Sequence, residues 1–162
     1  NIMYKVLDVC RHIINYCDDK EYNVSNLKLQ KILYFIQAYF LTQTEDKMPC
    51  FEEKIEAWDF GPVVPTAYHE YKQYGSADIP RISFFYDFAI DEKFHIKRVE
   101  YIDDEISAED KQLIDKMIDK LADYSTTTLV SITHNQAPWR DAYSQGKNTV
   151  ITTDAIRRYY NG

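Results

Sequence analysis

Residues 55–75 read IEAWDFGPVVPTAYHEYKQYG and place an alternating segment, a Gly-Pro pair and a second proline within one short stretch. Residues 55–60 alternate in residue type in the manner of a short strand. Gly61 can adopt positive φ and Pro62 lacks a backbone donor, so a tight bend is expected to follow the strand. The stretch therefore predicts a strand, a bend and a helix in close succession.

The helix of this stretch is predicted to begin at Pro65 and to run to about Tyr74. Proline presets φ for the first helical turn, and Gly75 is suited to the position that follows a helix. Ala67, Tyr71 and Tyr74 fall on one stripe, which indicates that about half of the tyrosines here can be core residues.

Helical periodicity dominates the rest of the chain. Residues 26–41 form the strongest element, because a serine or asparagine can cap its start and apolar residues cover more than half of its circumference. Such a helix should be central, with neighbours on several sides. Further helices are predicted over 3–17 (ending in a polar DDKE turn), 107–124 (opened by an acidic capping box), 125–135, 137–144 and 154–160.

The β signals are weaker. Residues 149–151 predict a short strand, residues 81–90 are irregular or extended, and residues 94–102 alternate as a strand would. The fold class is therefore mostly α (α+β): a compact bundle of about six helices, all-helical apart from one small antiparallel β element.

Length and hydropathy bound the class of protein. A chain of 162 residues fits a single domain, so residues 1–162 are expected to fold as one unit. Its apolar runs are far shorter than the roughly 20 residues of a membrane span, and no signal-peptide pattern is present. The interpretation is a cytoplasmic protein without a membrane partner.

The net charge is −7, from 26 acidic and 19 basic residues. Direct binding to DNA or RNA is not expected, because phosphate contacts require lysines and arginines. Acidic residues gather at 103–105 and at Glu109 and Asp110. They are interpreted as the solvated start of a helix, where the helix dipole favours negative charge, with an acidic contact face as the alternative.

Neither the cysteines nor the histidines predict a reactive site. Cys10, Cys17 and Cys50 fit buried reduced thiols, and no close Cys or His pair predicts a metal site. A catalytic set could be assembled from Cys50, His134 and Asn135, but no local nucleophile signature supports it. No phosphate-binding glycine motif occurs either. The sequence thus predicts no catalytic residue, no metal and no cofactor.

Aromatic residues are abundant, with 14 tyrosines, 8 phenylalanines and 2 tryptophans. One small core cannot readily enclose all of these rings together with their polar groups, so some are expected at the surface. Tyr and Trp provide large contact area with few rotatable bonds and dominate the hot spots of protein interfaces. The alternative is an aromatic-rich core and rim with no binding role.

Three segments, 27–41, 55–75 and 133–143, resemble in order the Panacea (SocA-like) antitoxin domain of bacterial and phage type II toxin–antitoxin systems. The middle segment is the most specific, because tryptophan, Gly-Pro and Tyr/Lys/Tyr-Gly seldom coincide at fixed offsets. The positions that match are Lys31, Tyr34, Trp58, Gly61, Pro62, Val63, Tyr68, Lys72, Tyr74, Gly75, His134, Pro138 and Trp139.

This resemblance implies a mostly helical antitoxin that neutralises a cognate toxin by direct binding and without catalysis. Tyr68, Lys72 and Tyr74 are expected to contribute to partner binding. The remaining family positions are expected to be structural: Lys31, Tyr34, Trp58, Gly61, Pro62, His134, Pro138 and Trp139. The chain has no basic recognition helix or spare length for a DNA-binding module, so a stand-alone antitoxin domain is predicted. Its acidic balance favours rapid encounter with a basic toxin.

The sequence leaves two alternative functions and the oligomeric state open. The same domain could serve a phage or mobile element by binding a host defence or regulatory protein. A small hydrolase or transferase would instead gather Lys31, Tyr34, His134 and Trp139 in a pocket with perturbed titrating groups. The oligomeric state does not follow from the sequence.

Overall fold

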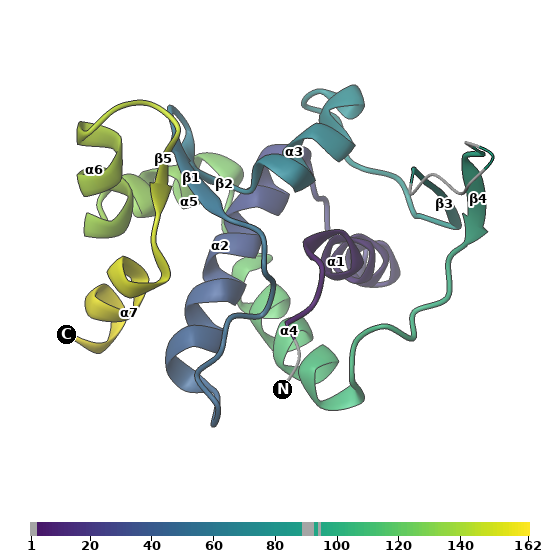
Figure 1. Cartoon of the computed structure of the whole chain (residues 1–162), viewed down its shortest axis with the longest axis horizontal. Helices are drawn as coiled ribbons and strands as arrows, with labels where there is room; N and C mark the ends of the chain where they lie inside the picture. The colour runs from purple at the N-terminus through teal and green to yellow at the C-terminus, as the bar shows by residue number, and fades with distance from the viewer. Residues whose placement is uncertain (1–2, 89–92, 94) are drawn as a thin grey trace.

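The structure, a computed structural model, describes residues 3–88, 93 and 95–162. Within these residues seven α-helices, one 3₁₀ turn and five strands are present (Figure 1). The helices are α1 (Val6–Lys20), α2 (Asn26–Gln43), α3 (Pro65–Tyr71), α4 (Ala108–Leu121), α5 (Thr126–His134), α6 (Ala137–Ser144) and α7 (Thr153–Asn161), and the 3₁₀ turn η1 is Lys72–Tyr74. The strands are β1 (Ile55–Trp58), β2 (Gly61–Val63), β3 (Phe84–Asp87), β4 (Lys97–Glu100) and β5 (Thr149–Ile151).

Helix α2 is central, as predicted from its broad apolar surface. In Figure 1 it lies between α1 and α4 on one side and the C-terminal α6 and α7 on the other. Its buried glutamines bind loop backbone: Gln37 accepts from the amides of Cys50 (2.8 Å) and Phe51 (3.2 Å), and Gln30 accepts from that of Val64 (3.0 Å). Because buried amides need a partner, these glutamines fix the segments that cover the helix.

The first sheet has the strand order β2-β1-β5, with antiparallel pairs throughout. Trp58 pairs with Gly61, so Asp59 and Phe60 form the turn between β1 and β2. The predicted bend thus lies just before the Gly-Pro pair, and the pair itself begins strand β2. Ile151 pairs with Ile55, which confirms the predicted strand at 149–151 and brings the C-terminal part of the chain onto β1.

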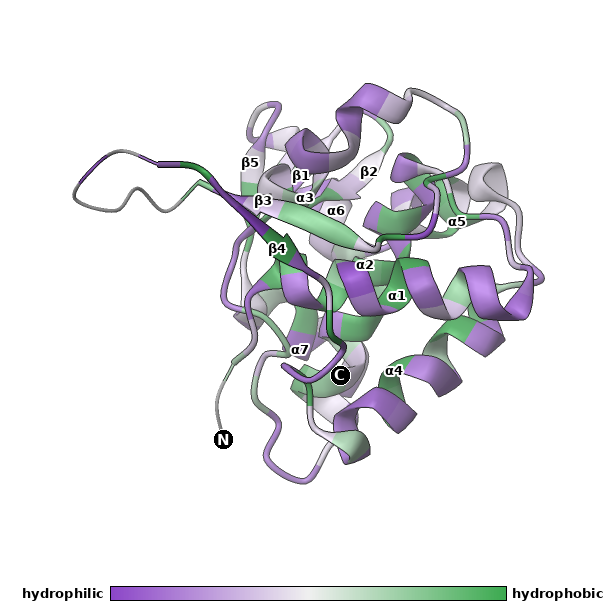
Figure 2. Ribbon diagram, turned by 90° about the vertical axis from the view of Figure 1, so that its right-hand side faces the viewer, coloured by the Kyte–Doolittle hydropathy of each residue, from purple (hydrophilic) through white to green (hydrophobic). Residues whose placement is uncertain are grey.

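The second sheet is the β3–β4 hairpin, in which Phe85 pairs with Val99. Figure 1 shows these strands at the right-hand edge of the molecule, beyond α1, and Figure 2, seen from that side, shows them in front of the other elements. Phe84, Tyr86 and Phe88 are exposed, whereas Phe85 packs under the Arg11 guanidinium, 3.5 Å from the ring centroid. The expectation of an all-helical chain apart from one β element is thus wrong, although the α+β class is confirmed.

Helices α1 and α4 are joined by a row of polar contacts, here called the α1–α4 ladder. Carboxylates spaced along α4 meet hydroxyls and an imidazole from α1 and its flanks. The contacts are Tyr4 Oη to Asp110 Oδ2 (2.5 Å), His12 Nε2 to Asp115 Oδ1 (2.6 Å), Tyr16 Oη to Asp119 Oδ1 (2.9 Å) and Tyr22 Oη to Asp119 Oδ1 (2.9 Å). These aspartates therefore bind α1 and its flanks. The interpretation of Asp110 as part of a solvated helix start is incomplete, because its carboxylate accepts from Tyr4.

Several predicted boundaries differ from the structure by a few residues, and two of these differences have a clear cause in the backbone. Helix α1 includes Lys20, because Glu21 adopts a left-handed conformation (φ 61°) and donates its amide to the carbonyls of Asp18 and Cys17. The polar DDK residues thus form the last helical turn. Helix α3 tightens into η1 before Gly75 ends it at φ 56°.

The cysteines are free and buried, as predicted. Among the described residues no helix has both the length and the apolar character that crossing a membrane requires.

Candidate interaction site around the tryptophan pair

A buried lysine supports the bend that follows Trp58. Lys31 of α2 has no exposed surface, and its Nζ donates to the carbonyl oxygen of Pro62 at 2.8 Å. The described residues provide it with no carboxylate partner, and burial lowers the pKa of Lys31 to about 7. A lysine in such a place is partly neutral near physiological pH, because desolvation disfavours the charged form.

Gly61 lies directly against this lysine. Its φ is 106°, and a Cβ at this position would stand 2.8 Å from both Lys31 Cε and Thr133 Oγ1. The expectation of positive φ at Gly61 is confirmed, and close approach adds a second reason for glycine here. Lys31, Gly61 and Pro62 therefore form one structural unit.

Tyr34 ties the central helix to the C-terminal part of the chain. Its hydroxyl donates to Gln136 Oε1 at 2.7 Å, and the hydroxyl of Tyr160 meets the same oxygen at 3.0 Å. Burial raises the pKa of the Tyr34 phenol, so it remains a donor. Neither Tyr160 nor Gln136 was among the predicted site residues.

The two tryptophans are joined through the backbone. Trp139 of α6 donates its Nε1–H to the carbonyl oxygen of Trp58 at 2.8 Å. Its ring stacks between His134 (centroids 4.1 Å apart) and Tyr143 (4.6 Å). Asp59 completes this group, here called the tryptophan cluster, by accepting from the Tyr143 hydroxyl and placing its carbonyl oxygen 2.9 Å from His134 Nε2. The bond from Tyr143 lowers the pKa of the Asp59 carboxyl.

The side chain of Trp58 contributes to an outer aromatic face, defined by Trp58, Tyr68 and His69. Trp58 meets Tyr68 edge-on with centroids 4.9 Å apart, and His69 lies 6.3 Å away. Trp58 and Tyr68 are half-buried and His69 is exposed. The face is thus held by α3 and β1 and presents rigid rings to solvent.

The three predicted partner-binding residues occupy different environments. Tyr68 belongs to the outer aromatic face, and Lys72 is exposed four residues later, on the same side by helical spacing. Tyr74 is half-buried and packs against the hydrophobic core. Partner binding by any of the three remains a proposal.

The catalytic set considered above is divided between separate surroundings. Cys50 is buried beside Gln37, and burial raises the pKa of its thiol. His134 lies in the tryptophan cluster. Of two cavities formed by described residues, of about 1260 and 350 Å³, Cys50 lines the larger. His134 lines neither cavity, and the same holds for Lys31, Tyr34 and Trp139.

Sequence reasoning did not select four polar residues that complete this site, namely Asp59, Thr133, Gln136 and Tyr143. All four fall within the two segments 55–75 and 133–143 that carried the resemblance. Their signal is indirect: a buried Tyr34 and two tryptophans each need a hydrogen-bond partner nearby, but the sequence does not say which residue supplies it.

The chain matches the model of a known protein family. The model of the family described as "Antitoxin SocA-like, Panacea domain" matches residues 29–140, which is more than half of the chain and reaches from α2 into α6. The search of curated proteins and the search of solved structures found no match. The family match agrees with the resemblance inferred from residues 27–143.

Proposed function

Because this chain belongs to the family of SocA-like antitoxins with a Panacea domain, we propose that it neutralises a cognate toxin by direct protein–protein binding and without catalysis. Family membership supports the antitoxin role. In this proposal residues 1–162 act as one domain in the cytoplasm, and neither nucleic acid nor a cofactor is required.

The observation that carries the binding proposal is the support beneath the outer aromatic face. The carbonyl oxygen of Trp58 is held by Trp139, and that of Pro62, four residues later, is held by Lys31. These bonds fix the backbone that carries the Trp58 ring, so less conformational freedom is lost on association, which favours affinity. Tryptophan and tyrosine are also the residues most often responsible for interface hot spots.

The non-catalytic part of the proposal rests on the state of the titratable groups at the family positions. Lys31 and Tyr34 are buried and already hydrogen-bonded, and they line neither of the two cavities. A general base or nucleophile needs access to the reacting atom. Their bonds instead connect α2 to the bend and to α6, as structural residues would.

The test is co-expression with the product of the neighbouring gene, with growth and complex formation followed together. We expect the intact protein to restore growth and to form a stoichiometric complex. Replacing Tyr68 or Lys72 by alanine should weaken the complex while the thermal midpoint stays close to that of the intact protein. Lys116→Ala, an exposed change on α4, is the matched control for Lys72. If the Tyr68→Ala and Lys72→Ala variants both neutralise the toxin fully, the proposal that these residues belong to the interface is wrong.

The host-factor alternative makes a different prediction for the same experiment. A protein that targets a host defence or regulatory protein would form no complex with the neighbouring product and would not restore growth. The tagged protein would instead retain a defined host protein, and that retention would depend on Tyr68. This outcome would show that the partner is a host protein and not a toxin.

A further inference from the structure

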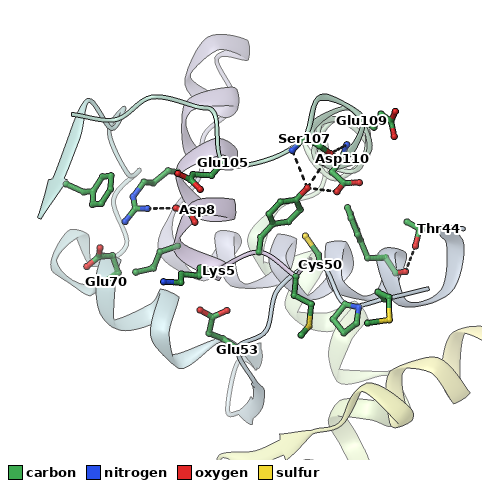
Figure 3. A pocket seen from close by; sticks show the side chains of 18 of the residues that line it. Lys5, Asp8, Thr44, Cys50, Glu53, Glu70, Glu105, Ser107, Glu109 and Asp110 are labelled. Atoms are coloured by element: carbon green, nitrogen blue, oxygen red, sulfur yellow. Dashed lines mark hydrogen bonds and ion pairs between the residues drawn. The ribbon is translucent and has the colours of Figure 1, made fainter. Parts of the chain in front are cut away.

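A large groove lies on another part of the molecule, between the first turns of α1 and α4, the segment after α2 and strand β3. Its volume is about 1260 Å³ (Figure 3). Its walls come from segments far apart in the chain, from Met3 to Asp110. We call it the acidic groove, for the reason that follows.

Carboxylates outnumber cations in the lining. Of the described residues that line the groove, eight are acidic and two are basic. The acidic residues are Asp8, Asp46, Glu53, Glu70, Asp87, Glu105, Glu109 and Asp110, and the basic residues are Lys5 and Arg11. Such an excess on the walls of one concavity concentrates negative potential inside it.

Arg11 belongs to the wall and is not available to a partner. Only 6% of its surface is exposed. Its guanidinium binds Asp8 Oδ1 at 2.9 Å and covers the ring of Phe85. This cation therefore offsets Asp8 and anchors the hairpin, and Lys5 is the one accessible cation among the described residues of the lining.

Besides Asp8, which pairs with Arg11, Glu53 and Asp110 are also held by contacts within the fold. Glu53 accepts from the amide of Val6 at the start of α1 (2.9 Å), and Asp110 accepts from the hydroxyl of Tyr4. The side-chain carboxylates of Glu70 and Glu105, in contrast, make no hydrogen bond or ion pair with the residues that the structure describes. Figure 3 shows Glu53 and Glu70 on either side of Lys5, with Glu105 near Asp8. Added positive charge here would relieve repulsion between like charges.

The groove also presents exposed apolar side chains. Met3, Met48, Tyr86 and Phe88 line it, and Phe88 is 65% exposed. Methionine adapts to irregular partners, and clusters of exposed large apolar groups mark interaction sites. A purely ionic ligand would leave these groups in water, so the complementary ligand carries both cationic and apolar groups.

The size of the groove favours a macromolecular ligand. Pockets for small molecules usually enclose roughly 300–1,000 Å³, and this one is larger. We propose that the acidic groove binds a segment of the toxin in which lysines or arginines alternate with apolar side chains. That the segment belongs to the toxin rests on the proposed function, whereas its chemistry follows from the groove alone.

The first experiment uses a labelled synthetic peptide of lysine and leucine that forms an amphipathic helix, with a glutamate and leucine peptide as the charge-reversed probe. Binding to the full chain is measured by fluorescence anisotropy. The groove variant is Glu70→Lys with Glu105→Lys. The control is Glu21→Lys with Asp123→Lys, which makes the same change in net charge at the other ends of α1 and α4, roughly 20 Å away by helix length.

We expect the lysine peptide to bind the intact protein and the glutamate peptide not to bind. The groove variant should lose about tenfold or more in affinity, and the control about twofold or less, because attraction by distant charges is screened. Equal losses in both variants, or no binding to the intact protein, would overturn the proposal. If the groove variant does not fold, Glu70→Gln with Glu105→Gln gives the same comparison with neutral side chains.

The second experiment repeats the groove and control variants with the toxin itself. Weakened neutralisation by the groove variant alone supports the toxin as the ligand. If both variants bind the toxin as tightly as the intact protein, the groove proposal fails while the proposed function stands. If no toxin binds but the lysine peptide still distinguishes the variants, the groove chemistry stands and the proposed function fails.

Discussion

The α-carbon of Gly61 faces the side chain of Lys31 so closely that a Cβ on the glycine would lie 2.8 Å from the lysine Cε. A family-motif glycine on the β1–β2 hairpin and a family-motif lysine on the central helix thus share one packing constraint. Thr133 of α5 stands at the same distance and closes the space from the other side. Three elements meet at this point, and its disturbance should reach the outer aromatic face.

Gly61→Ala should lower the free energy of unfolding by about 3 kcal/mol or more, through strained φ and overlap with Lys31 and Thr133. Gly75→Ala is the matched control: φ is also positive, but nothing lies within 4 Å of the new Cβ, so about 1 kcal/mol is expected. Urea unfolding of both variants measures the difference. Equal losses would show that close approach at Gly61 has no energetic importance.

Lys31→Met should change how stability depends on pH. The pKa of Lys31 is lowered to about 7 in the folded protein, so the unfolded chain binds the additional proton between about pH 7 and 10. The contribution of Lys31 to stability is therefore lowest below pH 7 and rises through this window.

Relative to Lys31→Met, the intact protein should gain up to about 1.4 kcal/mol per pH unit between pH 7 and 9. Urea midpoints of both proteins across this range test it. The variant also leaves the Pro62 carbonyl oxygen without its donor, which lowers its stability at every pH by about 1–3 kcal/mol. Parallel pH profiles for the two proteins would contradict the lowered pKa.

Trp139→Phe should separate stacking from hydrogen bonding in the tryptophan cluster. Phenylalanine can still stack between His134 and Tyr143 but cannot donate to the Trp58 carbonyl oxygen, so a loss of about 1 kcal/mol is expected. Trp139→Ala also removes the ring contacts and should cost about 3 kcal/mol. The midpoints of thermal unfolding rank the two variants by stability. Equal stability of both would assign the whole effect to the hydrogen bond.

His12→Ala should weaken the attachment of α4 to α1. The buried imidazole places Nδ1 2.7 Å from Asp103 Oδ2 and Nε2 2.6 Å from Asp115 Oδ1, so the ring connects two carboxylates. Removing the ring leaves two carboxylates facing one cavity, with an expected loss of about 2–3 kcal/mol. Tyr16→Phe, which removes one hydroxyl from the same ladder, should cost less than about 1 kcal/mol. Amide exchange in α4 should increase only in the first variant.

Local signals in the sequence were sufficient to predict the helices and the bend between β1 and β2. The broad apolar surface of residues 26–41 predicted a central helix, and the structure confirms it. Positive φ at Gly61 and the proline-led start of α3 were also predicted, because they depend on the chemistry of one or two residues. That Trp58 and Trp139 are structural stays a prediction, although the Trp139 indole donates to the Trp58 carbonyl oxygen.

Other features depend on pairings that periodicity cannot reveal. Lys31 lies at a polar position of its helix pattern, and its burial follows only from the carbonyl of Pro62, 31 residues later. Asp115 and Asp119 have the composition of a solvated helix face, yet they meet His12 and two tyrosines of the N-terminal part. The β3–β4 hairpin is weakly specified because most of its side chains are exposed.

The α1–α4 ladder also determines the order in which the protein can be completed during synthesis. Its contacts join residues separated by 97 to 106 positions, so α1 leaves the ribosome long before α4 exists. At 5–20 residues per second this delay is on the order of 5 to 20 seconds. Through this interval the polar side of α1 lacks its carboxylate partners, and the walls of the acidic groove are not yet assembled. A nascent chain therefore has its α2 scaffold well before it has the groove.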